Sequence, residues 1–183
     1  MDVAISDEHP GVSASTRSDG RPEFADVAAA ELDRVYRYLL QMLRNPTLAE
    51  DVCSATFERA WRDWHRFDPA RGRPGVWLIE VARRQALDHL RSSGRRRRRE
   101  TAWFATEPRS ASEPDVSGLS PQMRSALTAL TDQERELVAL RVLLGFTTDE
   151  SASITGMSRT GVSSGLHRSM AKLRRRLEGA PDA

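Results

Sequence analysis

Apolar residues recur every three or four positions in two separate blocks of this chain. In the first block they stand at positions 24, 28, 32, 35, 39 and 42, and in the second Val162, Leu166, Leu173 and Leu177 keep a helical spacing. This period is typical of amphipathic helices, and no stretch alternates as a half-buried strand does. The sequence therefore predicts an all-α fold made of two small helical domains.

The amino-acid composition indicates where these two domains begin and end. Residues 1–22 are rich in Ser, Asp, Gly and Pro, which predicts a disordered N-terminal tail. The stretch 100–120 contains prolines and serines without a helical period, which is typical of a flexible linker. We therefore expect a first domain over 23–95, a linker over 96–120, a second domain over 121–178 and a tail over 179–183.

Capping patterns predict where several helices begin and end. Thr47 with Glu50 has the spacing of a capping box, and Pro74 suits the first turn of a third helix. That helix is expected to end near Arg91, with a break at Ser-Ser-Gly over 92–94. In the second domain the expected caps are Thr131 with Glu134, Thr147 with Glu150, and Ser158.

Basic residues gather at two places although the net charge of the chain is only +2. The stretch 83–99 holds eight arginines and one acid, Asp88, and further basic residues stand between 168 and 176. Two basic patches on a near-neutral chain indicate a polyanion contacted at two points, although a solvated charged face would explain either patch alone.

Four aromatic residues lie near the first basic patch, and aromatic rings beside arginines can bind single-stranded nucleic acid by stacking and phosphate contact. We interpret Trp61 and Trp77 as core residues. Phe67 is left open, because it lies in a loop rich in proline and glycine.

The second domain contains the spacing of a helix-turn-helix. Ala152 is small where two helices would cross, Gly156 tolerates the turn, and Val162 supplies a buried aliphatic side chain. A recognition helix places its N-terminal residues against base edges, so residues 158–164 are the expected readers. Two packed helices that bind no DNA would show the same spacing.

The sequence gives little support to an enzyme. It has no phosphate-binding glycine loop, no Cys/His cluster of metal-ligand spacing and no nucleophile beside a base. Cys53 is the single cysteine, and no apolar run is long enough to cross a membrane. We expect a cytoplasmic protein that is not an enzyme, binds no metal or cofactor and does not insert into membranes.

Three stretches of the chain together resemble the extracytoplasmic-function (group IV) RNA polymerase sigma factors of the sigma-70 family. AEDVCSATFERAW (49–61) stands where that family has a sequence like AEDLVQETFLRAW, and FDPARGRPGVWLIEVARRQALDHLR (67–91) where it has FDPxRGxxxxWLxxIARNxALDxLR. These stretches resemble region 2, and residues 127–177 resemble region 4 in the family's order.

The resemblance implies a sigma factor that binds core RNA polymerase, through its β′ clamp and β flap, and directs promoter-specific initiation. Region 2 would capture the unpaired −10 strand, region 4 would read the −35 element as duplex, and an anti-sigma factor is a further partner that it allows. The implied polymerase contacts are Glu50, Asp51, Phe57 and Trp61. The implied −10 contacts are Phe67, Asp68, Arg71, Arg83, Arg84, Asp88, Arg91, Arg95, Arg96 and Arg97. The implied −35 contacts are Thr147, Ser158, Arg159, Thr160, Ser163, Ser164, His167, Arg168 and Lys172.

The chain departs from the family pattern at several of these positions. Ser54-Ala55 replaces the usual Gln-Glu, and Arg84 replaces an asparagine. Ser163, Ser164 and Gly165 offer short side chains or none on the expected reading face, which predicts weak base readout there. Two alternatives stay open: a free-standing helix-turn-helix regulator that binds duplex DNA as a dimer, and a sigma-like interaction protein that does not open promoters.

Overall fold

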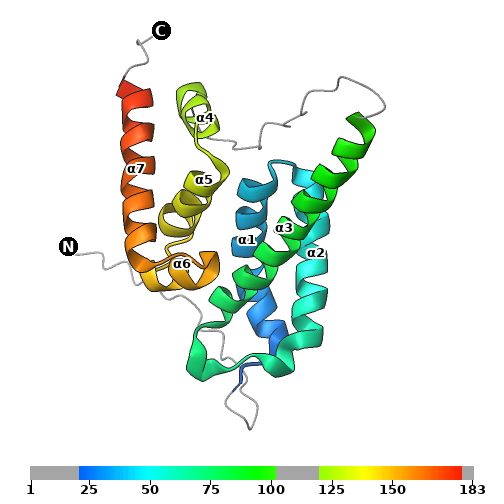
Figure 1. Cartoon of the computed structure of the whole chain (residues 1–183). Coiled ribbons are helices and arrows are strands. Elements are labelled where there is room, and N and C mark those ends of the chain that lie inside the picture. Colours follow the sequence, from blue (N-terminus) through cyan, green and yellow to red (C-terminus); the bar gives the residue numbers. More distant parts are fainter. Residues whose placement is uncertain (1–20, 102–119, 179–183) are drawn as a thin grey trace, which may run out of the picture.

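The computed structural model describes residues 21–101 and 120–178, of which the side chains at 93–101, 121 and 124 are excluded. Most of the predicted N-terminal tail (1–20), most of the linker (102–119) and the C-terminal tail (179–183) lie outside the described residues. All elements of the described part are helical, as the sequence predicts (Figure 1). None of the helices that are described is both long and apolar enough to span a bilayer.

The N-terminal unit consists of three α-helices that pack on one another (Figure 1). Leu39, Leu78 and Ile79 are fully buried between them. Two short 3₁₀ turns carry the chain from the second helix to the third. The elements are α1 (Phe24–Leu43), α2 (Pro46–Asp63), η1 (Trp64–Arg66), η2 (Pro69–Arg71) and α3 (Pro74–Thr101).

Two of the predicted helix boundaries in this unit are wrong. The helix α2 begins at Pro46, and the side chain of Asn45 accepts the Leu48 amide at 3.0 Å, so Asn45 is the cap and Thr47 lies inside the first turn. The helix α3 does not break at 92–94 but continues to Thr101, and its last turns extend beyond the ends of α1 and α2 (Figure 1). One glycine costs a helix only about 1 kcal/mol, and the arginines that follow are good helix formers.

The C-terminal unit is built around a helix-turn-helix. Both predicted capping boxes are present, at Thr131–Glu134 and Thr147–Glu150. Gly156 makes the turn with φ of +72°, a conformation that side chains with a Cβ rarely adopt. The elements are α4 (Pro121–Thr128), α5 (Asp132–Val138), the π-helical turn η3 (Ala139–Leu143), α6 (Thr148–Thr155) and α7 (Arg159–Glu178).

The two units are packed against each other, which the sequence did not predict. The helix α1 contacts α5 and η3, and α3 contacts α6 (Figure 1). Leu140, Leu144, Phe146 and Ile154 of the C-terminal unit belong to the same buried cluster as the core of α1–α3. A smaller core within the C-terminal unit joins Ala126, Leu130, Val138 and Leu173. We call the contact between the two units the seam.

Gly165 lies inside the C-terminal unit and not on its DNA-reading face, so the expectation for this residue is wrong. It is buried, and a Cβ built on it would lie 2.5 Å from Leu137 Cδ1. Leu137 is itself 1% exposed, so it has little room to move. The glycine therefore permits the close approach of α7 to α5.

Gly165→Ala is expected to lower the free energy of unfolding by about 1–2 kcal/mol, because overpacking of the α5–α7 contact costs about 1–3 kcal/mol and the better helix propensity of alanine offsets part of it. Urea unfolding followed by circular dichroism measures the change. Ser164→Ala, at the exposed neighbouring position, is the control and should be as stable as the parent or slightly more. An unchanged midpoint for Gly165→Ala would contradict this account of the packing.

Candidate functional site

The loop between α2 and α3 forms one wall of a cavity of about 310 Å³. Asp68 holds the loop in shape, because its carboxylate accepts the Ala70 amide at 2.9 Å. Arginines and aromatic rings supply most of the lining. The lining residues are Arg66, Phe67, Asp68, Arg71, Gly72, Arg73, Val76, Trp77, Glu80, Arg84 and Ser153.

The aromatic residues near the loop do not all behave as the sequence indicated. Phe67 is 3% exposed, and its ring stacks on Trp64 with the centroids 4.7 Å apart. Trp77 packs against both rings, which confirms its core role. Trp61, in contrast, is 68% exposed, so its interpretation as a core residue is wrong.

The arginines predicted along α3 fall into three groups. Arg84 and Arg91 are exposed, and Arg91 forms an ion pair with Asp88 at 3.3 Å. The side chains of Arg95, Arg96 and Arg97 lie outside the described residues, although their backbone is helical. Arg83 instead points into the seam.

Arg83 is part of a buried polar triad that joins the two units. Its Nε donates to Glu136 Oε1 at 2.7 Å, and Tyr38 Oη donates to the same oxygen at 2.6 Å. The Glu136 side chain is only 7% exposed. Burial, with the charge of Glu136 beside it, raises the pKa of Tyr38 well above its ordinary value, so the phenol stays protonated and remains a donor.

Two further polar contacts cross the seam beside the cavity. Arg73 Nη2 lies 2.6 Å from Glu150 Oε1, and Ser153 Oγ donates to Glu80 Oε1 at 2.6 Å. Burial acts to raise the pKa of Glu150, but hydrogen bonds from Thr147 and Arg73 outweigh it and lower that pKa. The carboxylate is therefore ionised at neutral pH.

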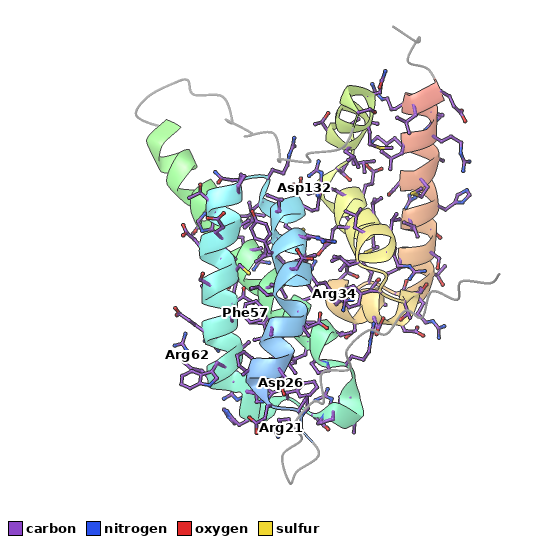
Figure 2. The ribbon with its side chains drawn as sticks, turned by 180° about the vertical axis from the view of Figure 1, so that it is seen from behind. Arg21, Asp26, Arg34, Phe57, Arg62 and Asp132 are labelled. Carbon is purple, nitrogen blue, oxygen red and sulfur yellow. The ribbon has the colours of Figure 1, made fainter. Side chains whose placement is uncertain are left out.

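Phe146 belongs to the buried cluster that the two units share and is 1% exposed. The guanidinium carbons of Arg34 and Arg73 lie 5.7 Å and 5.9 Å from its ring centroid, within the range of cation–π attraction. Figure 2 shows Arg34 on the side of α1 that faces the C-terminal unit.

The outer surface of α2 carries the residues expected to contact polymerase. Asp51 is exposed, opposite the face of Leu48 and Val52, as the helical spacing predicts, and Glu50 is exposed as well. Phe57 is partly buried, with its ring centroid 6.5 Å from that of Phe24. Figure 2 shows Arg62 on the side of α2 that faces away from the C-terminal unit. Much of this surface is thus open to a partner.

The recognition helix α7 presents an exposed row of polar residues. Ser158 caps the helix by accepting the Gly161 amide at 3.0 Å, as predicted. Three of the expected basic contacts also make contacts within the unit: Arg159 pairs with Asp149 at 2.7 Å, Lys172 pairs with Glu134 at 2.9 Å, and Arg168 Nε donates to the Ser164 carbonyl at 3.3 Å. Thr160, Ser163, Ser164, His167 and Arg168, which are also among the expected contacts, are exposed.

Sequence reasoning missed several residues that the fold brings to these surfaces. Arg66, Arg73 and Glu80 line the cavity although only their neighbours were predicted. The position of Arg66 and Arg73 in the same loop could have indicated them. Tyr38 and Glu136 gave no signal, because their contact joins residues far apart in the chain. Within the described residues, no group of acidic, histidine and cysteine side chains could hold a metal ion.

Comparison with known families decides the identity of both units. The model described as sigma-70 region 2 matches residues 27–96, and the model described as sigma-70 region 4 matches residues 120–173. The chain belongs to the sigma-70 family. It is a promoter-directing RNA polymerase sigma factor, and the match over region 2 gives the first block a role that a free-standing helix-turn-helix regulator would leave unexplained.

Relatives and solved structures agree with this membership. The sigma factor is 32% identical over 163 residues to the RNA polymerase sigma factor CarQ of Myxococcus xanthus, over 86% of this chain and 91% of that protein. It is 31% identical over 149 residues to the ECF RNA polymerase sigma factor BldN of Streptomyces coelicolor, over 79% of this chain and 56% of that protein.

Among solved structures, the fold is similar to that of the sigma factor RpoE of Bartonella quintana, solved in complex with the anti-sigma factor NepR. The TM-score is 0.71 at 21% identity, over 85% of this chain and 96% of that one. The structure of CnrH in complex with the cytosolic domain of CnrY gives 0.61 at 22% identity, over 85% and 88%. At these identities the likeness concerns the fold alone.

Proposed function

We propose that the sigma factor opens promoters by capturing the −10 non-template strand on region 2, in the cavity before α3 and along that helix. The observation that carries the proposal is the cavity itself, where exposed arginines surround a hollow with aromatic rings in its wall. Guanidinium groups bind phosphates, and a hollow of this size admits an unstacked base. Region 2 spans 23–95 in this proposal, and region 4 spans 121–178 after a linker over 96–120.

Each group of side chains has a distinct role in strand capture. Arg71, Arg84 and Arg91 contact phosphates, with Arg95, Arg96 and Arg97 continuing the basic surface along α3. Phe67 lies in the wall of the cavity, Asp68 holds its loop, and Asp88 orients Arg91. Arg83 contacts DNA only after it leaves Glu136.

Region 4 is proposed to read the −35 element as duplex, with α7 in the major groove. The exposed row from Ser158 to Arg168 supports this placement. Thr147, at the start of α6, and Lys172, further along α7, would contact the phosphate backbone. Short hydroxyl side chains at Ser163 and Ser164 favour weak discrimination between bases, because bidentate pairing needs a longer group.

The polymerase clamp is proposed to bind the exposed face of α2, with Glu50, Asp51, Phe57 and Trp61 as contacts. The exposure of Trp61 supports this, because a large apolar ring in water favours a partner surface.

Asp51→Arg is expected to weaken the complex with core polymerase about tenfold or more, because it reverses a charge on this face. A pull-down or a titration of labelled protein with core enzyme measures the affinity. Asp33→Arg is the matched control, because Asp33 is exposed on α1 and forms an ion pair with Arg37 of the same helix. Equal affinity of Asp51→Arg and the parent would contradict the assignment of α2.

The experiment that tests the proposed function is in vitro transcription with core RNA polymerase and a library of promoter sequences. Transcripts that depend on this protein and start at a common distance from shared −10 and −35 elements are the expected result. Polymerase binding without any transcript would favour a sigma-like interaction protein that does not open promoters.

We also propose a cellular location and a protein partner for this activity. We place the protein in the cytoplasm, where promoter DNA lies, and assign it no catalytic chemistry of its own. An anti-sigma factor is a proposed partner, which the solved complex of a similarly folded sigma factor with NepR supports.

A further inference from the structure

We propose that Asp149 is a positioning residue for Arg159, and that the pair makes guanine the preferred base at one position of the −35 element. This inference rests on the proposed function, because it takes α7 to be the helix that enters the major groove. Asp149 is not among the DNA contacts that the family resemblance implies. The proposal gives it a part in promoter selectivity.

Arg159 is the one long polar side chain in the reading segment 158–164. This segment has the sequence SRTGVSS, and its other side chains are short or, like Val162, buried. An arginine can donate to guanine O6 and N7 at the same time, which is the commonest base-specific contact in the major groove. Serine and threonine hydroxyls bind either kind of base and discriminate less. Base discrimination by this segment is therefore expected to be concentrated at Arg159.

The structure joins Arg159 to the preceding helix through Asp149. Asp149 lies in the first turn of α6, which packs against the start of α7 (Figure 1). Its Oδ1 lies 2.7 Å from Arg159 Nε. Among the described residues, the Arg159 guanidinium has no other ion pair or hydrogen bond. Both Nη atoms are therefore available to donate to a base while the carboxylate holds Nε.

Both members of the pair are accessible to DNA. The Arg159 side chain is 74% exposed and the Asp149 side chain is 62% exposed. An ion pair this exposed contributes little to the stability of the fold. The cap of α6 does not require Asp149 either, because Glu150 completes the capping box with Thr147. Asp149 can therefore be changed without unfolding the protein.

Asp149 acts on DNA binding in two ways. A carboxylate beside Nε restricts the arginine side chain before DNA arrives, so less conformational entropy is lost when the guanine contact forms. The same carboxylate repels phosphates and offsets the charge of Arg159, which weakens binding to DNA of any sequence. Removing Asp149 should therefore lower the preference for guanine and raise the affinity for unrelated DNA.

The test is a binding selection with the holoenzyme formed from core polymerase and the full chain. Duplex fragments with randomised bases are incubated with the holoenzyme, and the bound fragments are sequenced. For the parent, we expect guanine to be enriched about fivefold to a hundredfold over the other bases at one −35 position. Arg159→Ala should abolish this enrichment and leave the other positions unchanged.

Asp149→Ala should reduce the guanine enrichment to about a third of its parental value or less, again at that position only. It should also raise the affinity of the holoenzyme for DNA that lacks a −35 element by about twofold or more. When Arg159→Ala is already present, Asp149→Ala should not change the base preference further, because its effect passes through Arg159. Asp149→Glu, which retains a carboxylate, should keep part of the enrichment.

Asp132→Ala is the matched control. Asp132 also lies in the first turn of a helix that begins with a capping box, and it pairs with Arg135 of the same helix at 3.0 Å. This variant should keep the parental base preference at every position. Circular dichroism checks that the two variants are folded.

Three results would overturn the inference: parental guanine enrichment in Asp149→Ala, an equal loss at all −35 positions in that variant, or an enrichment that survives Arg159→Ala. The absence of any guanine preference in the parent would overturn it as well. The selection requires no promoter opening, so failure of the transcription assay would refute the proposed function alone. Transcription that does not depend on a −35 guanine would refute this inference and leave the proposed function standing.

Discussion

Phe146→Ala is expected to lower the free energy of unfolding by about 3–5 kcal/mol, the usual cost of truncating a fully buried phenylalanine. Phe146 is 1% exposed and belongs to the cluster that joins the two regions. The loss should appear as a fall in melting temperature of roughly 6–20 °C for a chain of this length. The removed ring also takes away the aromatic face on which Arg34 and Arg73 lie.

Thermal and urea unfolding followed by circular dichroism measure this change. Val142→Ala is the matched control, because Val142 lies close by in η3 and is 53% exposed. It should change stability by less than about 0.5 kcal/mol. Equal effects of the two substitutions would show that Phe146 is not packed at the seam in solution.

Replacing Arg66, Arg71 and Arg84 together by alanine is expected to weaken binding of the polymerase holoenzyme to the opened −10 strand by tenfold to a hundredfold. These arginines line the cavity and are exposed. Arg66 and Arg84 form only long, exposed ion pairs, with Asp63 at 3.8 Å and Glu80 at 3.9 Å, so each arginine can turn to a phosphate, and its removal is expected to cost about 0.5–1 kcal/mol. Each lost contact with a single strand should also reduce the slope of log affinity against log salt by about 0.7.

Binding of a labelled promoter with an unpaired −10 segment, measured over a range of salt concentrations, tests this. The triple variant should lose about 2 from the slope. Arg37→Ala is the control, because Arg37 pairs with Asp33 on α1 and lies outside the cavity lining. A full slope together with a changed −10 sequence preference would show that the arginines read bases and would contradict phosphate contact.

Local sequence determined most of the secondary structure of this sigma factor. The capping boxes at Thr131 and Thr147 form as their spacing predicts, because both partners lie within one turn of helix. The turn at Gly156 and the cap at Ser158 are equally local, so the helix-turn-helix could be predicted without any neighbour. The exposure of Asp51 followed from helical period alone.

Predictions of helix boundaries were wrong where two sequence patterns within a few residues indicated different boundaries. Thr47 with Glu50 matched the capping box, but Asn45 before Pro46 also fits a helix start and supplies the cap. The glycine at 94 suggested a helix end, but one glycine costs a helix only about 1 kcal/mol and the arginines after it are good helix formers.

Which side chains contact each other in the seam depends on the tertiary structure alone. Arg83 reads as one of a row of DNA-binding arginines, yet its partner Glu136 lies 53 residues away and only the docking of region 4 brings the two together. From the sequence, Gly165 is predicted to lie on the DNA-reading face without a side chain to contact a base. In the structure, the close approach of α5 buries it in the core. Helical period determines which residues share a face, whereas the neighbour that covers that face depends on how the helices pack, and this is why contacts distant in sequence could not be predicted.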